Sequence, residues 1–407
     1  MREMKDSGVE WIDSVPKTWE IVQLGTILYE HKNKNIGMKS SNLLSLSYGN
    51  IIHKDINSSD GLLPESFEGY NVIDDGDIVL RLTDLQNDQR SLRVGLSYEK
   101  GIVTSAYITL RRRNPTMSSK YLYYLIHSYD VRKGFYGMGA GVRQGLNYAG
   151  VKKIMLPVPS VEEQAAIADF LEKKQASVDS LITNVQAQIE NLKAYKQSLI
   201  TEVVTKGLDP TVPMKDSGVE WIGEIPAHWN VIRFRFIAKI TTGNQDTQNA
   251  NPDGIYPFYV RSPIVERCDT YTFDGEGILM AGDGAGAGRV FHLVNGKYAV
   301  HQRVYRFYDF KYMKPALMKL YLETMFSTVM DYGSAKTTVP SVRLPMIQDF
   351  YVCVPPENEQ QKMLLFLSEK TEKIEKLIAI KQAKIDKLNE YKKSLIYEYV
   401  TGKKEVS

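Results

Sequence analysis

Two stretches of the chain carry apolar residues at every seventh position, a spacing typical of coiled-coil helices. The seam of the first stretch consists of Leu171, Val178, Val185, Leu192 and Leu199. The seam of the second consists of Leu367, Ile374, Leu388 and Leu395, with Lys381 interrupting it and Leu377, Ile378 and Ile385 widening the stripe.

The pattern predicts two long helices, Glu162–Lys206 and Gln360–Lys403. Each would be about 66 Å long at 1.5 Å per residue. Because a domain of roughly 150 residues is too small to cover such a length, we expect the helices to pair with each other as an antiparallel coiled coil. Gly207 and the prolines that follow it are expected to end the first helix.

The rest of the chain reads as β-rich. Short runs such as "DIVLRL" and "YPFYV" are β-branched and aromatic and are bounded by turn-forming residues. Two shorter amphipathic helices are expected at residues 119–135 and 314–330. Asn295-Gly296 predicts a hairpin turn. The fold class is therefore α+β.

The sequence is an internal repeat. The same nine letters, "MKDSGVEWI", occupy Met4–Ile12 and Met214–Ile222, and Pro16 and Trp19 recur as Pro226 and Trp229. Downstream, "VPSVEEQ" parallels "VPPENEQ" at an offset of 196 residues, a multiple of seven. The two coiled-coil seams therefore share one register, and the chain is two copies of one unit.

Four segments follow from this repeat. We predict a first domain at residues 1–158, a first coiled-coil helix at 159–206, a linker with a second domain at 207–354 and a second coiled-coil helix at 355–407. The two domains diverge in sequence while the frame around them stays constant, and the whole has a pseudo-twofold internal symmetry.

Composition narrows the class of protein. The 407 residues include only two cysteines, Cys268 and Cys353, and carry a net charge of +3. Two cysteines are too few for a disulfide framework, which is typical of a reducing compartment. No apolar run approaches the ~20 residues of a membrane span, so we expect a cytoplasmic protein without a membrane partner.

Catalytic motifs are missing or incomplete. No "[DN]-P-P-[FYW]" loop of an adenine methyltransferase and no phosphate-binding loop is present. Gly282, Gly284 and Ala287 imitate a dinucleotide motif, but the following residues 289–294 read as a strand and not as a helix. Asp74 and Asp77 precede a strand without the spacing of a nuclease metal site. We therefore predict no catalytic residue, no metal site and no cofactor in this chain.

The doubled layout resembles the specificity subunit of type I restriction-modification systems. The resemblance rests on the two "MKDSGVEWI" starts, the two "V-P-x-x-x-x-E-Q" entries into long helices and their "LI-x-E-x-V-T" ends, and it covers essentially the whole chain. Asp13 departs from the pattern, where the second copy keeps Gly223.

The resemblance implies a noncatalytic DNA-recognition subunit. Each variable domain would be a target-recognition domain that reads one half of a bipartite, asymmetric target in double-stranded DNA. The helices would set the gap and dock two methyltransferase subunits, with restriction/translocase subunits joining them. S-adenosylmethionine, ATP and Mg²⁺ would be bound by those partners. The resemblance leaves open whether the complex restricts DNA or only methylates it.

Candidate DNA-contacting residues are those whose amides and guanidinium groups can reach base edges or phosphates from polar, loop-like stretches. In the first domain they are Arg81, Gln86, Asn87, Arg90, Arg93, Arg143, Gln144 and Asn147. In the second they are Asn244, Gln245, His301, Gln302, Arg303, Lys336, Thr337 and Thr338. His301 is equally compatible with a place in the core. Arg111–Arg113 end a strand, so alternation turns Arg112 away from its neighbours.

Two other classes of protein remain as alternatives. A coiled-coil scaffold without DNA specificity would explain the long helices, but not two divergent domains in a constant frame. A nuclease fused to a coiled coil would require catalytic spacing that the sequence lacks.

Overall fold

The computed structural model describes residues 2–57, 64, 66–88, 90–136, 138, 145–333 and 340–406, with only the backbone at 328–333. The chain divides into two units. Unit 1 consists of Met1–Val185 with Ala383–Ser407, and unit 2 of Gln186–Gln382. Each unit mixes a β-rich body with long-helix segments, which confirms the α+β class. None of the described helices combines the length and hydropathy needed to cross a membrane.

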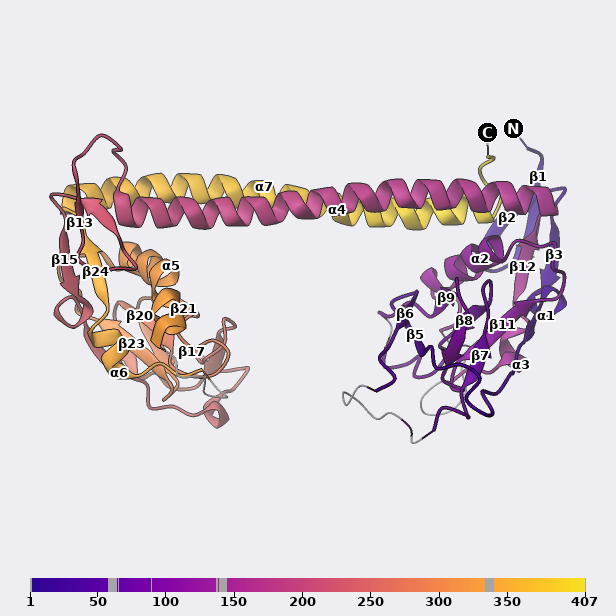
Figure 1. Cartoon of the computed structure of the whole chain (residues 1–407), viewed down its shortest axis with the longest axis horizontal. Helices are drawn as coiled ribbons and strands as arrows, with labels where there is room; N and C mark the ends of the chain where they lie inside the picture. Colours follow the sequence, from indigo (N-terminus) through magenta and orange to yellow (C-terminus); the bar gives the residue numbers. More distant parts are fainter. Residues whose placement is uncertain are drawn as a thin grey trace. The chain divides into compact units, whose positions relative to one another are not determined.

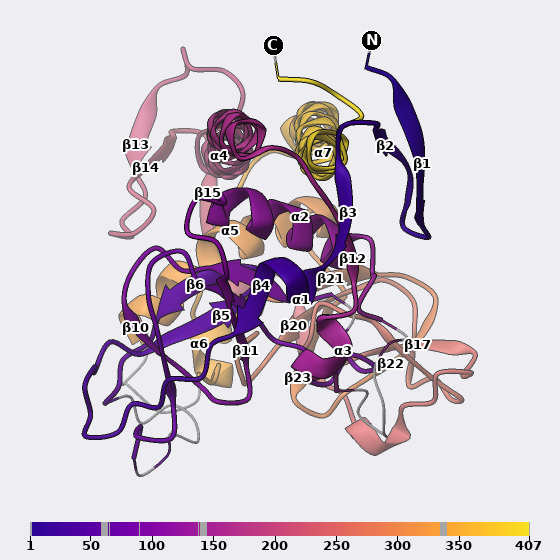
Figure 2. The ribbon, with the colours of Figure 1, turned by 90° about the vertical axis from the view of Figure 1, so that its right-hand side faces the viewer.

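The two predicted long helices are present as α4 (Val161–Lys206) and α7 (Glu357–Val400). Their ends agree with the predicted ends to within three residues. In unit 1 the first part of α4 lies beside the last part of α7, where Lys392 Nζ pairs with Asp179 Oδ1 at 2.5 Å (Figure 2).

The same pairing occurs inside unit 2, between the second part of α4 and the first part of α7. Lys196 Nζ pairs with Glu375 Oε1 at 2.5 Å, and Lys381 Nζ donates to Gln188 Oε1 at 2.6 Å. Residue numbers therefore rise along one helix as they fall along the other, so the predicted antiparallel arrangement holds. Lys381 interrupts the apolar seam, and its ammonium group bonds to the polar side chain of Gln188 on the other helix.

Most seam positions are buried as predicted. The buried members are Leu171, Val178, Val185, Leu367, Ile374, Ile385 and Leu395. Leu377 is an exception because its side chain is 47% exposed. The stripe on α7 is thus narrower than the sequence predicted.

Each unit contains a four-stranded antiparallel sheet of matching topology. In unit 1 the order is β4 (Leu28–Glu30), β11 (Ile108–Arg112), β8 (Ile78–Leu80) and β9 (Val94–Leu96). In unit 2 it is β16 (Lys239–Thr242), β23 (Val304–Tyr308), β20 (Gly277–Ala281) and β21 (Phe291–Val294). The two predicted shorter helices, α2 (Ser119–Val131) and α5 (Pro315–Gly333), lie between these sheets and the long helices (Figure 1).

The remaining elements of unit 1 are strand pairs and short helices. The pairs are β1 (Met4–Val9) with β2 (Ile12–Pro16), β3 (Glu20–Gln23) with β12 (Met155–Val158), β5 (Leu44–Ser47) with β6 (Asn50–His53), and β7 (Asn71–Ile73) with β10 (Gly101–Val103). The short helices are α1 (Leu24–Ile27) and α3 (Tyr148–Val151).

Unit 2 repeats part of this plan. It pairs β13 (Met214–Asp216) with β14 (Glu224–Pro226) and β15 (Asn230–Arg233) with β24 (Tyr351–Val354), and its short helices are η1 (Phe234–Phe236), η2 (Thr247–Asn249) and α6 (Leu344–Gln348). A second four-stranded sheet has the order β18 (Glu266–Cys268), β17 (Tyr256–Tyr259), β22 (Lys297–Val300) and β19 (Phe273–Asp274).

The hairpin predicted at Asn295-Gly296 is wrong in one respect. The turn exists, and Gly296 has a φ of 85°. However, β21 pairs with β20 whereas β22 pairs with β17 and β19, so the turn joins strands of two different sheets. A local turn motif does not specify which strand becomes the partner.

The repeated tryptophans tie each domain to both long helices. Trp19 Nε1 donates to Glu163 Oε2 at 3.0 Å, at the start of α4. A Cβ on Gly402, just after α7, would lie 3.1 Å from the Trp19 ring and 2.5 Å from Pro16. Only glycine fits this approach, and its φ of 71° closes the helix in the left-handed region.

Unit 2 repeats this arrangement with the helices exchanged. Trp229 Nε1 donates to Glu359 Oε2 at 2.9 Å, at the start of α7, and Gly207 follows the end of α4. A Cβ on Gly207 would lie 3.1 Å from the Trp229 ring. The repeated sequence therefore encodes a clamp that binds the first turn of one helix and the end of the other.

The glutamines of the two "E-Q" motifs complete the frame. Gln164 Nε2 donates to Pro159 O, and its Oε1 accepts from Ser118 N, at the residue that caps α2. Gln360 likewise donates to Pro355 O and accepts from Lys314 N, immediately before α5. Both glutamines are buried, so these bonds satisfy amides that water cannot reach.

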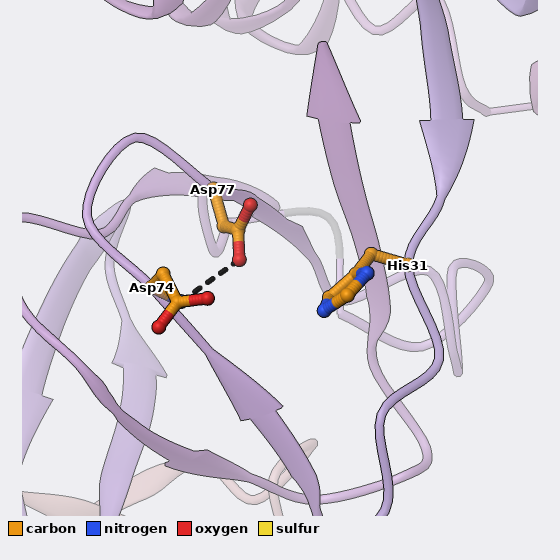
Figure 3. Close-up of side chains that lie close together, drawn as sticks. All are labelled: His31, Asp74 and Asp77. Carbon is orange, nitrogen blue, oxygen red and sulfur yellow. Dashed lines mark hydrogen bonds between the residues drawn. The ribbon is translucent and has the colours of Figure 1, made fainter. Parts of the chain in front are cut away.

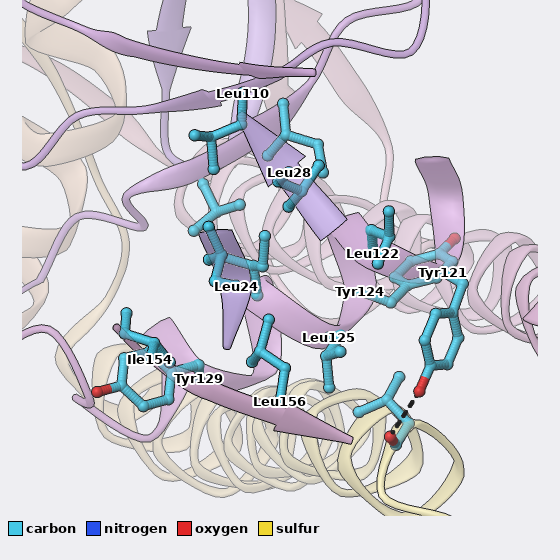
Figure 4. Packing of buried hydrophobic residues seen from close by; sticks show 14 of the residues in the cluster. Leu24, Leu28, Leu110, Tyr121, Leu122, Tyr124, Leu125, Tyr129, Ile154 and Leu156 are labelled. Carbon is cyan, nitrogen blue, oxygen red and sulfur yellow. Dashed lines mark hydrogen bonds between the residues drawn. The ribbon is translucent and has the colours of Figure 1, made fainter. Parts of the chain in front are cut away.

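The core of unit 1 joins α2 to the sheet and to α7. Leu122, Tyr124 and Leu125 of α2 lie near Leu24 and Leu156 (Figure 4). The hydroxyl group of Tyr121 hydrogen-bonds to two carbonyl oxygens, Pro157 O at 3.1 Å and Val400 O at 3.2 Å. The end of α7 is thereby fixed on the domain.

Replacing Trp19 with alanine tests the clamp. The side chain is 1% exposed, so we expect Trp19→Ala to lower the free energy of unfolding of unit 1 by about 3–5 kcal/mol. Half-exposed Trp11, whose indole donates to Met155 O, is the matched control and should cost less. Urea unfolding with hydrogen exchange would measure both, and equal losses in the two variants would contradict the clamp.

Candidate nucleic-acid interface

The two candidate stretches of the first domain lie side by side. Leu146 N donates to Leu82 O at 2.9 Å, which joins the segment 81–93 to the segment that precedes α3. Leu82 and Leu146 are 64 positions apart in the sequence, and the fold brings them to one place. Arg143 and Gln144 lie outside the described residues.

Three of the candidates on this loop are exposed. Gln86, Asn87 and Arg90 face solvent, and Arg81 is half-buried. Asn87 Nδ2 donates to Asp84 Oδ1 at 2.7 Å. These side chains are accessible to solvent.

Asn147 has a structural task. It is exposed, but it caps α3 by accepting a hydrogen bond from Gly150 N at 3.2 Å. A cap of this kind satisfies an amide that the helix leaves unpaired. A DNA contact through Asn147 Oδ1 would compete with this bond.

The structure contradicts the prediction that Arg93 contacts DNA. Its side chain is fully buried, so it cannot contact DNA in this structure. Its guanidinium group instead donates to Thr83 O at 3.1 Å, to Asp84 O at 3.5 Å and to Asp88 O. Arg93 is thus the centre around which the candidate loop folds.

Two carboxylates hold the second half of this loop. Hydrogen bonds from Ser91 lower the pKa of Asp88 to about 2, so the group stays charged. Asp130, in α2, accepts from Arg93 N. Burial raises the pKa of Asp130 to about 6, and the hydrogen bond from Arg93 acts against that rise because it favours the charged form.

The three arginines after "ITL" are all used internally. Arg111 bonds to Asp74 and Asp77, Arg112 to Met117 O and Ser119 Oγ, and Arg113 to Gly25 O. Each thus has a protein partner in the structure. This includes Arg111 and Arg113, which strand alternation places on the same face.

One cluster of possible metal ligands occurs among the described residues. His31, Asp74 and Asp77 have ligand atoms within 4.8 Å of one another (Figure 3). However, Arg111 Nε donates to Asp77 Oδ1 at 2.7 Å, and its Nη2 donates to both carboxylates at 2.7 Å and 2.6 Å. A cation would have to displace this guanidinium group. We therefore infer that the two carboxylates serve to bind Arg111 and stabilise the fold.

The candidate stretches of the second domain also converge. Gln302 N donates to Gln245 O at 2.8 Å, and Gln302 Nε2 donates to Asp246 Oδ2 at 2.6 Å. A Cβ on Gly243 would lie 2.0 Å from Val300 O, so only glycine permits this contact. Asn244 is exposed between these residues. Lys336, Thr337 and Thr338 lie outside the described residues.

The structure also contradicts the prediction that His301 contacts DNA. His301 is 4% exposed, and its Nδ1 accepts from Arg303 N at 3.0 Å. Burial and the charge of Arg261 lower its pKa, so the ring is neutral. His301 therefore orders the backbone, whereas the side chain of Arg303 is 65% exposed.

The glycine-rich loop after β20 does not open a helix, which a dinucleotide site would require. It leads into strand β21 and not into a helix, as the sequence predicted. It does place Asp283 beside Arg303 and beside Arg261, a residue that the sequence analysis missed. The short stretch "VRSP" around Arg261 has no basic neighbour or repeat counterpart that would have indicated it.

Known proteins resemble the chain throughout. The family model described as Type I restriction modification DNA specificity domain matches residues 16–191 and again residues 226–400. The MjaVIII specificity subunit of Methanocaldococcus jannaschii is 24% identical over 96% of this chain and 93% of its own. The putative MjaX specificity subunit of the same organism is 23% identical over 96% of this chain and 95% of its own.

A solved structure has a similar fold. It comes from work on complex assembly and conformational transition of the type I R-M system, and it superposes with a TM-score of 0.70 at 14% identity. The match covers 95% of this chain and 99% of that chain.

Proposed function

Because the chain belongs to the type I restriction-modification DNA specificity domain family, we propose that it is the noncatalytic DNA-recognition subunit of a type I restriction-modification complex. The observation that carries this proposal is the double match. Each copy of the family domain begins at the proline before the clamp tryptophan and extends into a long helix. One copy serves each half of a bipartite DNA target.

The candidate loops support this assignment. In each unit, segments far apart in the sequence meet and present exposed amide or guanidinium groups, including Gln86, Arg90, Asn244 and Arg303. Such groups form hydrogen bonds with base edges and phosphates. Different loops on a common frame would allow the halves of the target to differ.

The long helices serve as docking surface for two methyltransferase subunits in this proposal. Several apolar side chains of α4 and α7 remain exposed. They are Leu181, Tyr195, Leu365, Leu377, Ile380 and Tyr391. The catalytic sites, with S-adenosylmethionine, ATP and Mg²⁺, belong to the methyltransferase and restriction subunits.

A genome-wide map of N6-methyladenine tests the function. We expect deletion of this gene in its host to abolish methylation at one split motif and a plasmid copy to restore it, because the methyltransferase would lose its means of locating the site. A plasmid copy with a stop codon before Met214 is the control for plasmid effects. Persistence of every motif after deletion, in a strain with no second copy, would refute the proposal.

A further inference from the structure

We propose that Arg261 and Arg303, which both pair with Asp283, are specificity-determining residues that read base edges in the half-site of the second domain. The inference rests on the proposed function and goes beyond it by naming the readers. Arg261 comes from a stretch in which the sequence indicated no DNA contact.

The backbone around this group is tightly fixed. Gly282 N donates to Arg303 O at 2.9 Å, and Val342 N donates to Gly282 O at 2.8 Å. Gly284 N donates to Pro340 O at 3.0 Å. Two segments distant in sequence therefore hold Asp283 in one position, and one of them follows the candidate residues 336–338 in the sequence.

Asp283 shares its carboxylate between the two arginines. Oδ1 accepts from Arg261 Nη1 at 2.9 Å, and Oδ2 lies 3.8 Å from Arg303 Nε. Within the described part of the chain, neither guanidinium group has another side-chain partner. Each therefore keeps nitrogen donors for a ligand while the carboxylate restricts its orientation.

The group borders an open hollow. The hollow has a volume of about 640 Å³ and is lined by Arg261, Ser262, Asp283 and the glycine-rich loop. The side chains of Arg261 and Arg303 are 46% and 65% exposed, whereas that of Asp283 is 21% exposed. The positive ends thus face solvent and the negative group lies behind them.

The guanidinium donors suit a base edge. Arg261, Arg303 and Asp283 carry one net positive charge, and Glu266, which lines the same hollow, offsets it, so the fit rests on the hydrogen-bond donors and not on net charge. A guanidinium group donates two parallel hydrogen bonds to O6 and N7 of guanine, the commonest specific contact in the major groove. An exposed ion pair contributes little to stability, so stability alone does not account for the arrangement.

The same unit provides a matched control. Arg233 and Arg235 also share one carboxylate, that of Asp349, and their side chains are 45% and 38% exposed. This second group lies at the end of β15, in η1 and just after α6, and none of its three residues lines the hollow. Loss of Arg235 therefore removes an equivalent ion pair without touching the proposed readers.

The experiment maps N6-methyladenine in a host without other adenine methylation that expresses the full chain with its methyltransferase partner. We expect Arg261→Gln and Arg303→Gln each to lower discrimination at a position of one half-site by about tenfold to a hundredfold. The other half-site and the gap should not change. Arg261→Lys, which keeps the charge but loses the fork, should relax the same position, and Arg235→Gln should give the wild-type map.

The alternative outcomes are distinct. A wild-type motif in both glutamine variants would overturn the inference, as would an equal loss at all sites without altered base preference, which indicates phosphate contact or support of the fold. Relaxation by Arg235→Gln would also overturn it. Because Arg303 is largely exposed, its variant remains informative if Arg261→Gln does not fold. Failure of the proposed function differs from all of these, since the wild-type chain would then write no split motif.

Discussion

Exchange of residues 234–343 for those of a family member with another target is expected to change one half of the methylated sequence completely. This segment lies between β15 and α6 and contains the candidate loops of the second domain. The original half-site should lose methylation by about a thousandfold or more, which is the usual margin between specific and nonspecific binding. Sequencing of methylated DNA from cells with the partner subunit would measure the change.

The reciprocal exchange provides the control. Replacing residues 24–147, between β3 and α3, should change the other half-site and leave the first intact. Both exchanges retain the clamp tryptophans, the paired strands beside them and the long helices, so the frame is preserved. If either exchange altered both halves of the motif, the two domains would not read DNA independently.

Lengthening both long helices by seven residues is expected to widen the gap between the half-sites by about three base pairs. Seven residues add about 10.5 Å to a helix, and DNA rises about 3.4 Å per base pair. Duplicating residues 178–184 in α4 and 388–394 in α7 places the added turns opposite each other, near the Asp179–Lys392 pair. A seven-residue insertion keeps the apolar seam in register.

Insertion into α4 alone is the control. The helices would then differ in length, and the clamps at Trp19 and Trp229 could not both bind a helix start and a helix end. We expect this variant to be destabilised and to lose methylation. An unchanged gap in the doubly lengthened protein would show that the helices do not set the spacing.

The candidate site shows where sequence reasoning reached its limit. The polar composition of "RLTDLQNDQRSLR" predicted an exposed loop. It could not predict that Arg93 is buried while Arg90 is exposed. Arg93 is buried because its guanidinium group donates hydrogen bonds to the carbonyl groups of Thr83 and Asp84 within the loop. The order of residues specifies which donors are present, and only the fold specifies which acceptors they meet.

The same limit applies in the second domain. Gln302 and Arg303 were identifiable by their chemistry, whereas His301 between the strands was ambiguous and proved to be buried. The sequence did not indicate Arg261 as a candidate, because its neighbours in the structure, Asp283 and Arg303, lie more than twenty positions away in the chain. Likewise, the Asn295-Gly296 turn was visible, but the partners of its strands were not.

The sequence by itself determined the repeat, the long helices and their register, because periodic burial is a local property that apolar spacing records directly. It also identified the family, since the constant frame keeps the residues that clamp one helix start to the other helix end. The tertiary structure alone decided which polar side chains lie on the surface and which segments meet at each candidate interface. Those features depend on long-range contacts between short strands, and no periodicity of the chain encodes them.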